Sequence, residues 1–193
     1  LAGLVKWLGH EPVRIHCIGD SMDALRQTLD TAATDCDIIL TSGGVSMGEW
    51  DLVRKIMEEE GDIHFWRIKL RPGSPPLFGL WNSTPIFGLP GNPVSSHVVF
   101  RMLVAPWIRN TTKATGPIET RVIATLASSV KSTKDCLTLR RVSLETTEDG
   151  FVAHQRIHQG SGNLASIALS EGMVVLKPNQ EYKIGDRAEV MIL

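Results

Sequence analysis

Three short loops carry the residue types that could bind an anionic ligand. The first is SGGVSMGEWD (residues 42–51). Its glycines and hydroxyl residues can present backbone N–H and O–H donors to an anion; they are Ser42, Gly43, Gly44, Ser46 and Gly48. The loop ends in acidic residues, among them Asp51, which suits an oxyanion held together with a divalent cation such as Mg²⁺. The alternative is that Asp51 only caps the following helix.

The second loop, RPGSP (residues 71–75), follows an apolar segment, Ile63 to Leu70, that is expected to be a strand. Residues two apart in a strand point to the same face. Arg67, Lys69 and Arg71 are therefore expected to form a cationic row that faces an anion. The alternative is a solvated edge of positive charge.

The third loop, FGLPGNPVS (residues 87–95), joins an expected strand to an expected helix. Its candidate ligand-binding residues are Pro90, Gly91, Asn92 and Ser95. The N–H groups at the start of a helix have no intrahelical partner, so they can bind an anion. Taken alone, this loop favours an ordinary strand-to-helix turn over a ligand site.

The elements around these loops alternate between strand and helix. Apolar residues at helical spacing predict helices over residues 1–8, 51–60 and 93–109, and one that begins after Asp20 or Ser21. Short apolar runs predict strands over residues 13–18, 37–41, 63–70, 77–80 and 85–89. We therefore expect an α/β layered domain with a mainly parallel sheet, and ligand crevices in such sheets lie at the carboxyl ends of the strands.

The pattern changes after Asn110. A polar segment over residues 111–119 indicates a linker, and the rest of the chain contains short strand-like runs. They predict a small all-β barrel or sandwich, which divides the chain into domains at residues 1–116 and 117–193. A change of alternation at Arg140 and Arg141 predicts a β-bulge.

Composition narrows the class of protein. The 193 residues carry a formal net charge of −1, which gives no overall attraction to nucleic acid. No apolar run approaches the roughly 20 residues that span a bilayer. The cysteines, Cys17, Cys36 and Cys136, form no CxxC pair and are expected to be reduced and mostly buried, in a cytoplasmic protein.

The order SGGVSMGEWD, FWRIKLRPGSP, FGLPGNPVS, followed by HQGSGNLASIALSEGMVVL (residues 158–176), resembles the molybdopterin molybdotransferase family, which includes the C-terminal domain of gephyrin. The resemblance spans nearly the whole chain. It implies a homodimer with active sites between subunits, and a possible molybdopterin adenylyltransferase partner. It further implies Mg²⁺-dependent insertion of molybdate into adenylylated molybdopterin, with release of AMP.

The same resemblance assigns roles to individual residues. Asp20 and Asp51 would hold Mg²⁺ and orient the reacting oxyanion, and Arg67 and Arg71 would neutralise molybdate or pyrophosphate. The glycine loop would seat the pterin, and Ser161 would face the site. The family usually has basic residues, commonly lysines, where this chain has Arg67 and Arg71, and many bacterial members have a further lysine at the position of Ser74.

The family's first strand, with an acidic Gly-Asp-Glu-like loop, and two further subdomains would precede Leu1. The chain is therefore expected to be the C-terminal part of a longer protein and incomplete for catalysis by itself. Two other functions remain open. One is a gephyrin-like scaffold without catalysis, and the other is a molybdopterin adenylyltransferase, a family that shares the α/β fold but lacks the C-terminal β domain.

Overall fold

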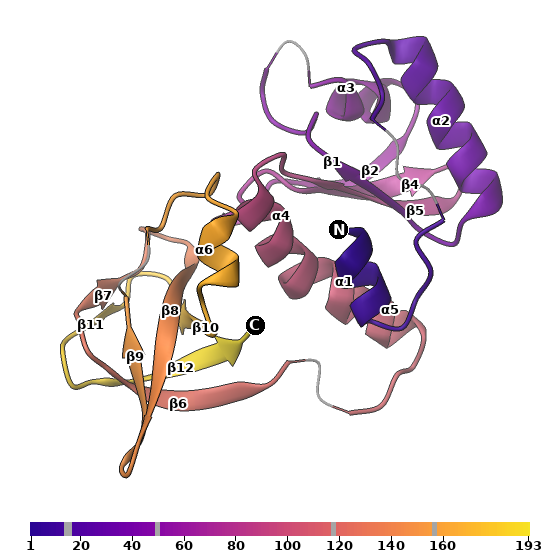
Figure 1. Ribbon diagram of the computed structural model, residues 1–193. Coiled ribbons are helices and arrows are strands. Elements are labelled where there is room, and N and C mark those ends of the chain that lie inside the picture. Colours follow the sequence, from indigo (N-terminus) through magenta and orange to yellow (C-terminus); the bar gives the residue numbers. More distant parts are fainter. Residues whose placement is uncertain (14–16, 49–50, 117–118, 156–157) are drawn as a thin grey trace. The chain divides into compact units, whose positions relative to one another are not determined.

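The computed structural model describes residues 1–13, 17–48, 51–116, 119–155 and 158–193. The chain folds into two compact units (Figure 1). The first contains Leu1–Ile68 and Gly73–Ile108, and the second contains Lys69–Pro72 and Arg109–Leu193. The expected domain boundary between residues 116 and 117 stays a prediction, since residue 117 is not described.

The first unit is built on a four-stranded sheet in the order β1-β5-β4-β2. Its strands are β1 (Ile39–Ser42), β2 (Asp62–Trp66), β4 (Leu77–Trp81) and β5 (Thr84–Leu89). Only β1 and β5 pair in parallel, whereas β4 is antiparallel to both β5 and β2. The expected α/β layers are confirmed, but the expectation of a mainly parallel sheet was wrong.

The reason lies in the turn between β4 and β5. Asn82 and Ser83 have φ of 47° and 66°, the left-handed backbone of a tight hairpin turn. A parallel connection needs a crossover of a dozen or more residues. Two residues can only reverse the chain, so β4 and β5 form a hairpin. Of the strand expected over residues 13–18, residues 14–16 lie outside the described residues, and the remaining three are not in a strand.

Alternation along β4 and β5 fixes which helices cover each face of the sheet. Leu77, Trp81 and Ile86 belong to a buried cluster with residues of α2 (Met22–Asp35) and α3 (Leu52–Glu59). Phe78 and Phe87 have the opposite parity, and both rings contact Trp107 of α5 (Ala105–Thr111). The sheet is therefore covered on both faces, as Figure 1 also shows.

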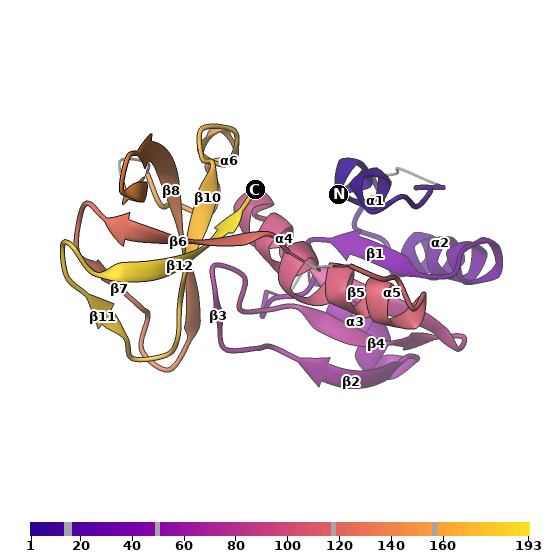
Figure 2. The ribbon, with the colours of Figure 1, turned by 90° about the horizontal axis from the view of Figure 1, so that it is seen from below.

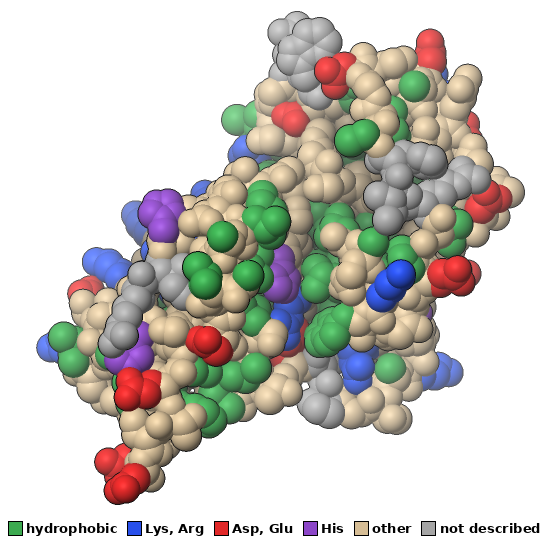
Figure 3. All heavy atoms as spheres, viewed as in Figure 1, with side chains coloured by type: hydrophobic (Ala, Val, Ile, Leu, Met, Phe, Trp, Pro, Cys, Tyr) green, Lys and Arg blue, Asp and Glu red, His purple; other side chains and the backbone are tan. Residues whose placement is uncertain are grey.

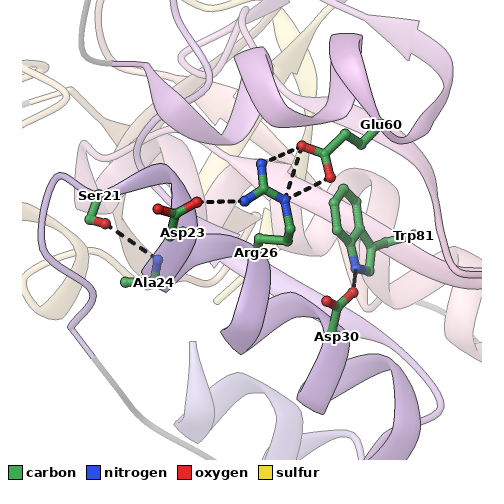
Figure 4. A network of polar contacts seen from close by, with 7 residues as sticks. All are labelled: Ser21, Asp23, Ala24, Arg26, Asp30, Glu60 and Trp81. Carbon is green, nitrogen blue, oxygen red and sulfur yellow. Dashed lines mark hydrogen bonds and ion pairs between the residues drawn. The ribbon is translucent and has the colours of Figure 1, made fainter.

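Polar contacts tie α2 to its neighbours (Figure 4). The Ser21 side chain accepts the Ala24 N–H at the start of the helix, as the sequence predicts. Arg26 donates to both carboxylate oxygens of Glu60, just after α3, and Trp81 Nε1 donates to Asp30 at 2.9 Å. These bonds hold α2 against α3 and β4.

The expected helix over residues 93–109 is present in three segments: α4 (Pro93–Val99), a π-helix (Phe100–Val104) and α5. The first predicted helix is α1 (Ala2–Trp7), and none of its residues is buried. The Arg101 guanidinium lies 5.1 Å from the centroid of the Trp7 ring.

The second unit is a closed barrel (Figure 2). Its strands are β6 (Arg121–Leu126), β8 (Leu137–Thr147), β9 (Gly150–His154), β10 (Gly172–Leu176) and β12 (Arg187–Ile192). They run in the order β10-β12-β6-β9-β8, and pairing of β8 with β10 closes the ring. The expected all-β barrel is therefore confirmed.

Smaller elements complete the second unit. The two-residue strand β3 (Leu70–Arg71) pairs in parallel with the start of β8, and β7 (Val130–Lys131) pairs with β11 (Glu181–Tyr182). The helix α6 (Ala165–Ala168) precedes β10. The β8–β10 register runs without a break from Thr138 to Val142, so the expected bulge at Arg140 was wrong. The alternation changes there because β8 is buried on both faces.

The free end of the β8–β9 hairpin carries acidic side chains (Figure 3). None of the helices traced in the described parts of the chain has the length and apolar character to cross a membrane.

All three cysteines are free, but Cys17 is exposed and the other two are half-buried, so the expectation that they are mostly buried was wrong.

Candidate functional site

The loop after β1 is fixed by one buried side chain and by two glycines. Gly43 and Gly44 have φ of 92° and 71°, a backbone conformation that glycine adopts without steric cost. Val45 then enters the core with 2% of its surface exposed. The polar loop residues on either side of Val45 stay exposed: Ser42, Ser46 and Gly48. The sequence therefore gives a loop whose polar groups face solvent while its middle residue holds it to the sheet.

The loop after β5 lies directly beside it, because β5 is the parallel neighbour of β1. Gly43 N–H donates to the Leu89 carbonyl at 2.9 Å, one residue beyond the last strand pair. A β-carbon on Gly91 would lie 3.5 Å from the Gly43 Cα, so the two backbones are in contact. Ser42 Oγ is 3.5 Å from the Pro90 carbonyl, which also accepts the Ser96 hydroxyl. The structure thus brings the SGGVS and PGNP loops together.

The remaining candidates of the third loop lie at the start of α4. Asn92 is the N-cap residue and Pro93 follows at the first helical position. Asn92 is exposed, but Ser95 is only 4% exposed. Of the four residues proposed from this loop, Gly91 and Asn92 are open to solvent, whereas Pro90 and Ser95 are buried.

Asp51 is the N-cap residue of α3, but its carboxylate makes no hydrogen bond to that helix. It accepts the N–H of Gly48 instead, which closes the loop from within. One carboxylate oxygen therefore braces the loop, and the other has no hydrogen-bond partner among the described residues. This arrangement differs from the simple helix cap that the sequence left open as an alternative.

Asp20 is exposed and directly precedes the N-cap Ser21 of α2. Its carboxylate makes no hydrogen bond or ion pair with another described residue. Within the described ranges, no three histidine, cysteine, aspartate or glutamate side chains gather as a metal site. A magnesium ion needs only one or two protein carboxylates beside substrate phosphates, so Asp20 and Asp51 stay candidates on their chemistry.

The expected cationic row was wrong. Strand β2 ends at Trp66, and Arg67 has φ of 72°, which turns the chain out of the strand. Arg67 N–H and Ile68 N–H donate across to Pro76 and Ser74. Arg71 then lies in β3 of the second unit. Arg67 and Arg71 are both exposed, but they do not share one strand face.

Sequence reasoning missed two residues beside the first loop. Trp66 Nε1 donates to the Val45 carbonyl at 2.8 Å, and Arg54 Nη1 donates to the Ser46 carbonyl at 3.2 Å. Arg54 also pairs with Glu58, and this hydrogen bond raises the pKa of Arg54. Arg54 lies outside the quoted motifs, and Trp66 lies within FWRIKLRPGSP, but its type and spacing did not indicate a contact with the first loop.

Ser161 lies in the second unit, half-buried in the turn that precedes α6. The loop before it is held by Arg141, which is 1% exposed and donates through Nη2 to the carbonyls of His158 and Gly160. Burial lowers the pKa of Arg141, and the neighbouring positive charge of Arg140 adds to this effect. Gln159 exchanges two hydrogen bonds with the Arg141 backbone.

Two family models match separate parts of the chain. Residues 1–110 match the model described as "Probable molybdopterin binding domain". Residues 124–193 match the MoeA C-terminal region, domain IV.

Individual relatives agree with these matches. The molybdopterin molybdenumtransferase of Nostoc sp. is 32% identical over 201 aligned residues, which cover 100% of this chain and 45% of the relative. The enzyme of the same name from Haemophilus influenzae is 31% identical and covers 90% of this chain and 44% of its own length. The chain therefore spans about half the length of the curated relatives it matches.

The fold is also that of a solved relative. The crystal structure of the molybdopterin biosynthesis MoeA protein from Pyrococcus horikosii matches 99% of this chain and 46% of its own, with a TM-score of 0.82 and 27% identity. With an α/β unit that matches a molybdopterin-binding model and a barrel that matches the MoeA C-terminal region, the chain belongs to the molybdopterin molybdotransferase (MoeA) family and corresponds to its C-terminal portion.

Proposed function

We propose that this chain takes part in molybdenum cofactor biosynthesis, as the pterin-binding portion of an enzyme that inserts molybdate into adenylylated molybdopterin and releases AMP. One observation carries the proposal. The SGGVS and PGNP loops meet at the carboxyl ends of two adjacent parallel strands, joined by the Gly43–Leu89 hydrogen bond. Ligand crevices of open α/β sheets lie at such strand ends.

The two loops offer suitable groups for a phosphorylated ligand. Gly91 and the glycines of the SGGVS loop have no side chain to keep a phosphate from the backbone. Ser42 and Ser46 are exposed and add hydroxyl groups. Backbone N–H groups and hydroxyls at such a loop bind anions without adding positive charge. In this role Ser42, Gly43, Gly44, Ser46, Gly48, Gly91 and Asn92 seat the substrate.

Mg²⁺ fits the charge of this loop. Apart from the Gly48 N–H, the Asp51 carboxylate has no hydrogen-bond partner among the described residues, and Asp20 is exposed with no described partner. Both would hold the ion beside substrate phosphate. A bound Mg²⁺ ion would neutralise negative charge on the phosphate that departs with AMP. The residues of the two loops bind and orient the substrate, and the bond from Gly48 N–H to Asp51 holds the first loop in shape.

Arg67 and Arg71 supply positive charge for molybdate or pyrophosphate, and Ser161 contributes a hydroxyl from the barrel. Their assignment rests on their exposure or partial exposure and on their positions in the family motifs. Arg71 has a planar guanidinium where the family commonly has an ammonium, so it presents two parallel donors to an oxyanion.

The proposal extends to the assembled protein. We infer a cytoplasmic homodimer in which each active site includes residues of both subunits, supplied with substrate by a molybdopterin adenylyltransferase. Three free cysteines agree with a reducing compartment. Analytical ultracentrifugation of the longer protein tests the dimer, and a monomer at working concentration would rule it out.

Calorimetric titration with adenylylated molybdopterin and Mg²⁺ tests the ligand. The native chain should show saturable binding. Asp51→Ala should weaken it, and Asp51→Asn should weaken it equally, because asparagine can still accept the Gly48 N–H but carries no charge. Asp149→Asn, at the acidic end of the β8–β9 hairpin in Figure 3, is the control and should bind normally.

Two outcomes would contradict this proposal. If Asp51→Asn binds like the native chain, the carboxylate only braces the loop and holds no ion. If neither the native chain nor the longer protein binds the ligand, the pterin site does not lie at these loops. Binding of a receptor-like peptide by such a protein would then favour the scaffold function.

A further inference from the structure

Trp66 contacts the glycine loop directly. Its indole Nε1–H donates to the Val45 carbonyl at 2.8 Å, and its ring packs against the buried cluster that also contains Val45. Val45 is the residue that anchors the loop, with 2% exposure. A shift of the Trp66 ring would therefore be transmitted to the backbone between Gly44 and Ser46.

Two arginine side chains lie over the same indole. The Arg54 guanidinium carbon is 4.2 Å from the centroid of the Trp66 ring, and that of Arg67 is 4.7 Å from it. Both distances fall within the range of cation–π attraction, for which tryptophan is the best aromatic partner. A planar guanidinium can stack on the ring, whereas a lysine ammonium cannot. The indole therefore offers each guanidinium a face on which it can stack.

The two arginines differ in how their charge is used. Arg54 donates through Nε to Glu58 at 2.8 Å and through Nη1 to the Ser46 carbonyl at 3.2 Å, so a carboxylate balances its charge. Arg67 is exposed and has no carboxylate partner among the described residues. Its backbone is held at φ of 72° by the bond from its N–H to the Pro76 carbonyl at 2.8 Å. Arg67 is therefore a cation held beside the loop, with no carboxylate among the described residues to balance its charge.

We propose that Trp66 is a positioning residue for oxyanion binding, which holds the Arg67 guanidinium and the SGGVS loop in one arrangement that molybdate can bridge. The inference rests on the proposed function, and it identifies Trp66 as the residue that orients the Arg67 guanidinium for molybdate. Arg54 stacks on the same ring, and its hydrogen bond to the Ser46 carbonyl holds the loop just after Val45.

Nuclear magnetic resonance of the arginine Nε–Hε groups tests the proposal, with sodium molybdate as the probe. In the native chain the Trp66 ring current should shift the Arg67 Hε resonance upfield, and molybdate should perturb it saturably. Trp66→Leu should abolish the upfield shift and weaken molybdate binding about three- to tenfold, the range expected for a lost cation–π contact.

Trp66→Phe separates the two roles of the ring. Phenylalanine keeps an aromatic face for Arg67 but cannot donate to Val45. We expect a retained upfield shift at Arg67 and an affinity between those of the native chain and Trp66→Leu. Because this variant fills most of the same volume, it also keeps the test valid if Trp66→Leu fails to fold.

Trp7→Leu is the matched control. Among the described residues, it removes another pair in which a guanidinium lies over an indole, Arg101 and Trp7 at 5.1 Å. Trp7 is 56% exposed. Molybdate affinity should be unchanged. The loss of molybdate affinity in the double variant Trp66→Leu with Arg67→Ala should be smaller than the sum of the two single losses, because part of the effect of Trp66 acts through Arg67.

Three results would overturn the proposal: an unshifted Arg67 resonance in the native chain, no response of that resonance to molybdate, or fully additive losses in the double variant. These results are distinct from failure of the proposed function. Adenylylated molybdopterin could still bind with its dependence on Asp51 intact, and molybdate could still bind at Arg67 when the pterin does not.

Discussion

Gly88 in β5 lies against the side chain of Val45, so closely that a β-carbon at position 88 would be 2.5 Å from Val45 Cγ1. The glycine leaves the space into which the loop residue inserts. Leu77 and Thr41 border the same space. The position of the glycine loop therefore depends on Gly88 of the neighbouring strand, which has no side chain to occupy the space of Val45.

Gly88→Ala should displace Val45 and loosen the loop. Overpacking of this kind costs about 1–3 kcal/mol of unfolding free energy. We expect a lower melting temperature and faster hydrogen exchange of the Trp66 indole N–H, whose acceptor is the Val45 carbonyl. Gly3→Ala is the control, because a β-carbon there meets nothing within 4 Å and alanine favours the helix. Equal exchange rates in Gly88→Ala and the native chain would contradict this account.

Arg141 and Arg140 are neighbours in β8 with different environments, which makes them a matched pair. Arg141→Gln should cost about 1–3 kcal/mol, since the carbonyls of His158 and Gly160 lose a buried donor. Arg140→Gln should change stability by less than about 0.5 kcal/mol, because its bond to Lys131 is long at 3.4 Å and exposed. Urea unfolding of both variants measures the difference. Equal losses would show that the buried guanidinium does not hold the loop.

His97 in α4 should make the first unit sensitive to acid. Burial lowers the pKa of His97 to about 4, and the positive charge of Arg101 contributes to this. In the unfolded chain the imidazole titrates near 6.5, so the unfolded state gains a proton first as the pH falls. The neutral imidazole thus contributes stability above pH 6.5, and this contribution is lost as the pH falls toward 4.

The loss attributable to His97 is up to about 3 kcal/mol. We expect His97→Gln to show a shallower fall in unfolding free energy than the native chain between pH 6.5 and 4. Titration of the imidazole resonance gives the folded pKa directly. A midpoint near 6.5 in the folded protein would refute the prediction.

The contact between Arg26 and Glu60, drawn in Figure 4, should be visible in the titration of the carboxylate. Hydrogen bonds from Arg26 lower the pKa of Glu60. The stabilisation is therefore present above the unfolded pKa of a glutamate and is lost as the pH falls through the lower, folded value. In Arg26→Gln the Glu60 carboxyl resonance should titrate near its ordinary pKa, whereas Asp149→Asn should leave it unchanged.

The sequence predicted the parts of the molecule whose determinants are local. Glycine, proline and hydroxyl residues mark the loops after β1 and β5, because each satisfies a specific backbone requirement of a turn. The strand and helix spacings also predicted the α/β unit and the barrel. The hairpin between β4 and β5 was missed because its two turn residues, Asn82 and Ser83, carry no glycine signal.

Other features depend on contacts that no local pattern encodes. Arg67 leaves the strand at a positive φ that arginine rarely adopts, and bonds from Arg67 and Ile68 to Pro76 and Ser74 hold it there. The stacking of Arg54 on Trp66 joins residues from a helix and a strand through the packing of the unit. A pattern of residue types along the chain specifies neither contact.

Strand β3 has a consequence for how the protein is made and could be rearranged. Its residues lie within the stretch that matches the molybdopterin-binding model, yet they pair with Leu137 and Thr138 of the barrel. During synthesis on the ribosome, β3 emerges with the α/β unit, and it can pair only after β8 has been synthesised. A recombination event at the linker would transfer the barrel without β3 and leave the start of β8 without this partner strand, although each unit has its own core.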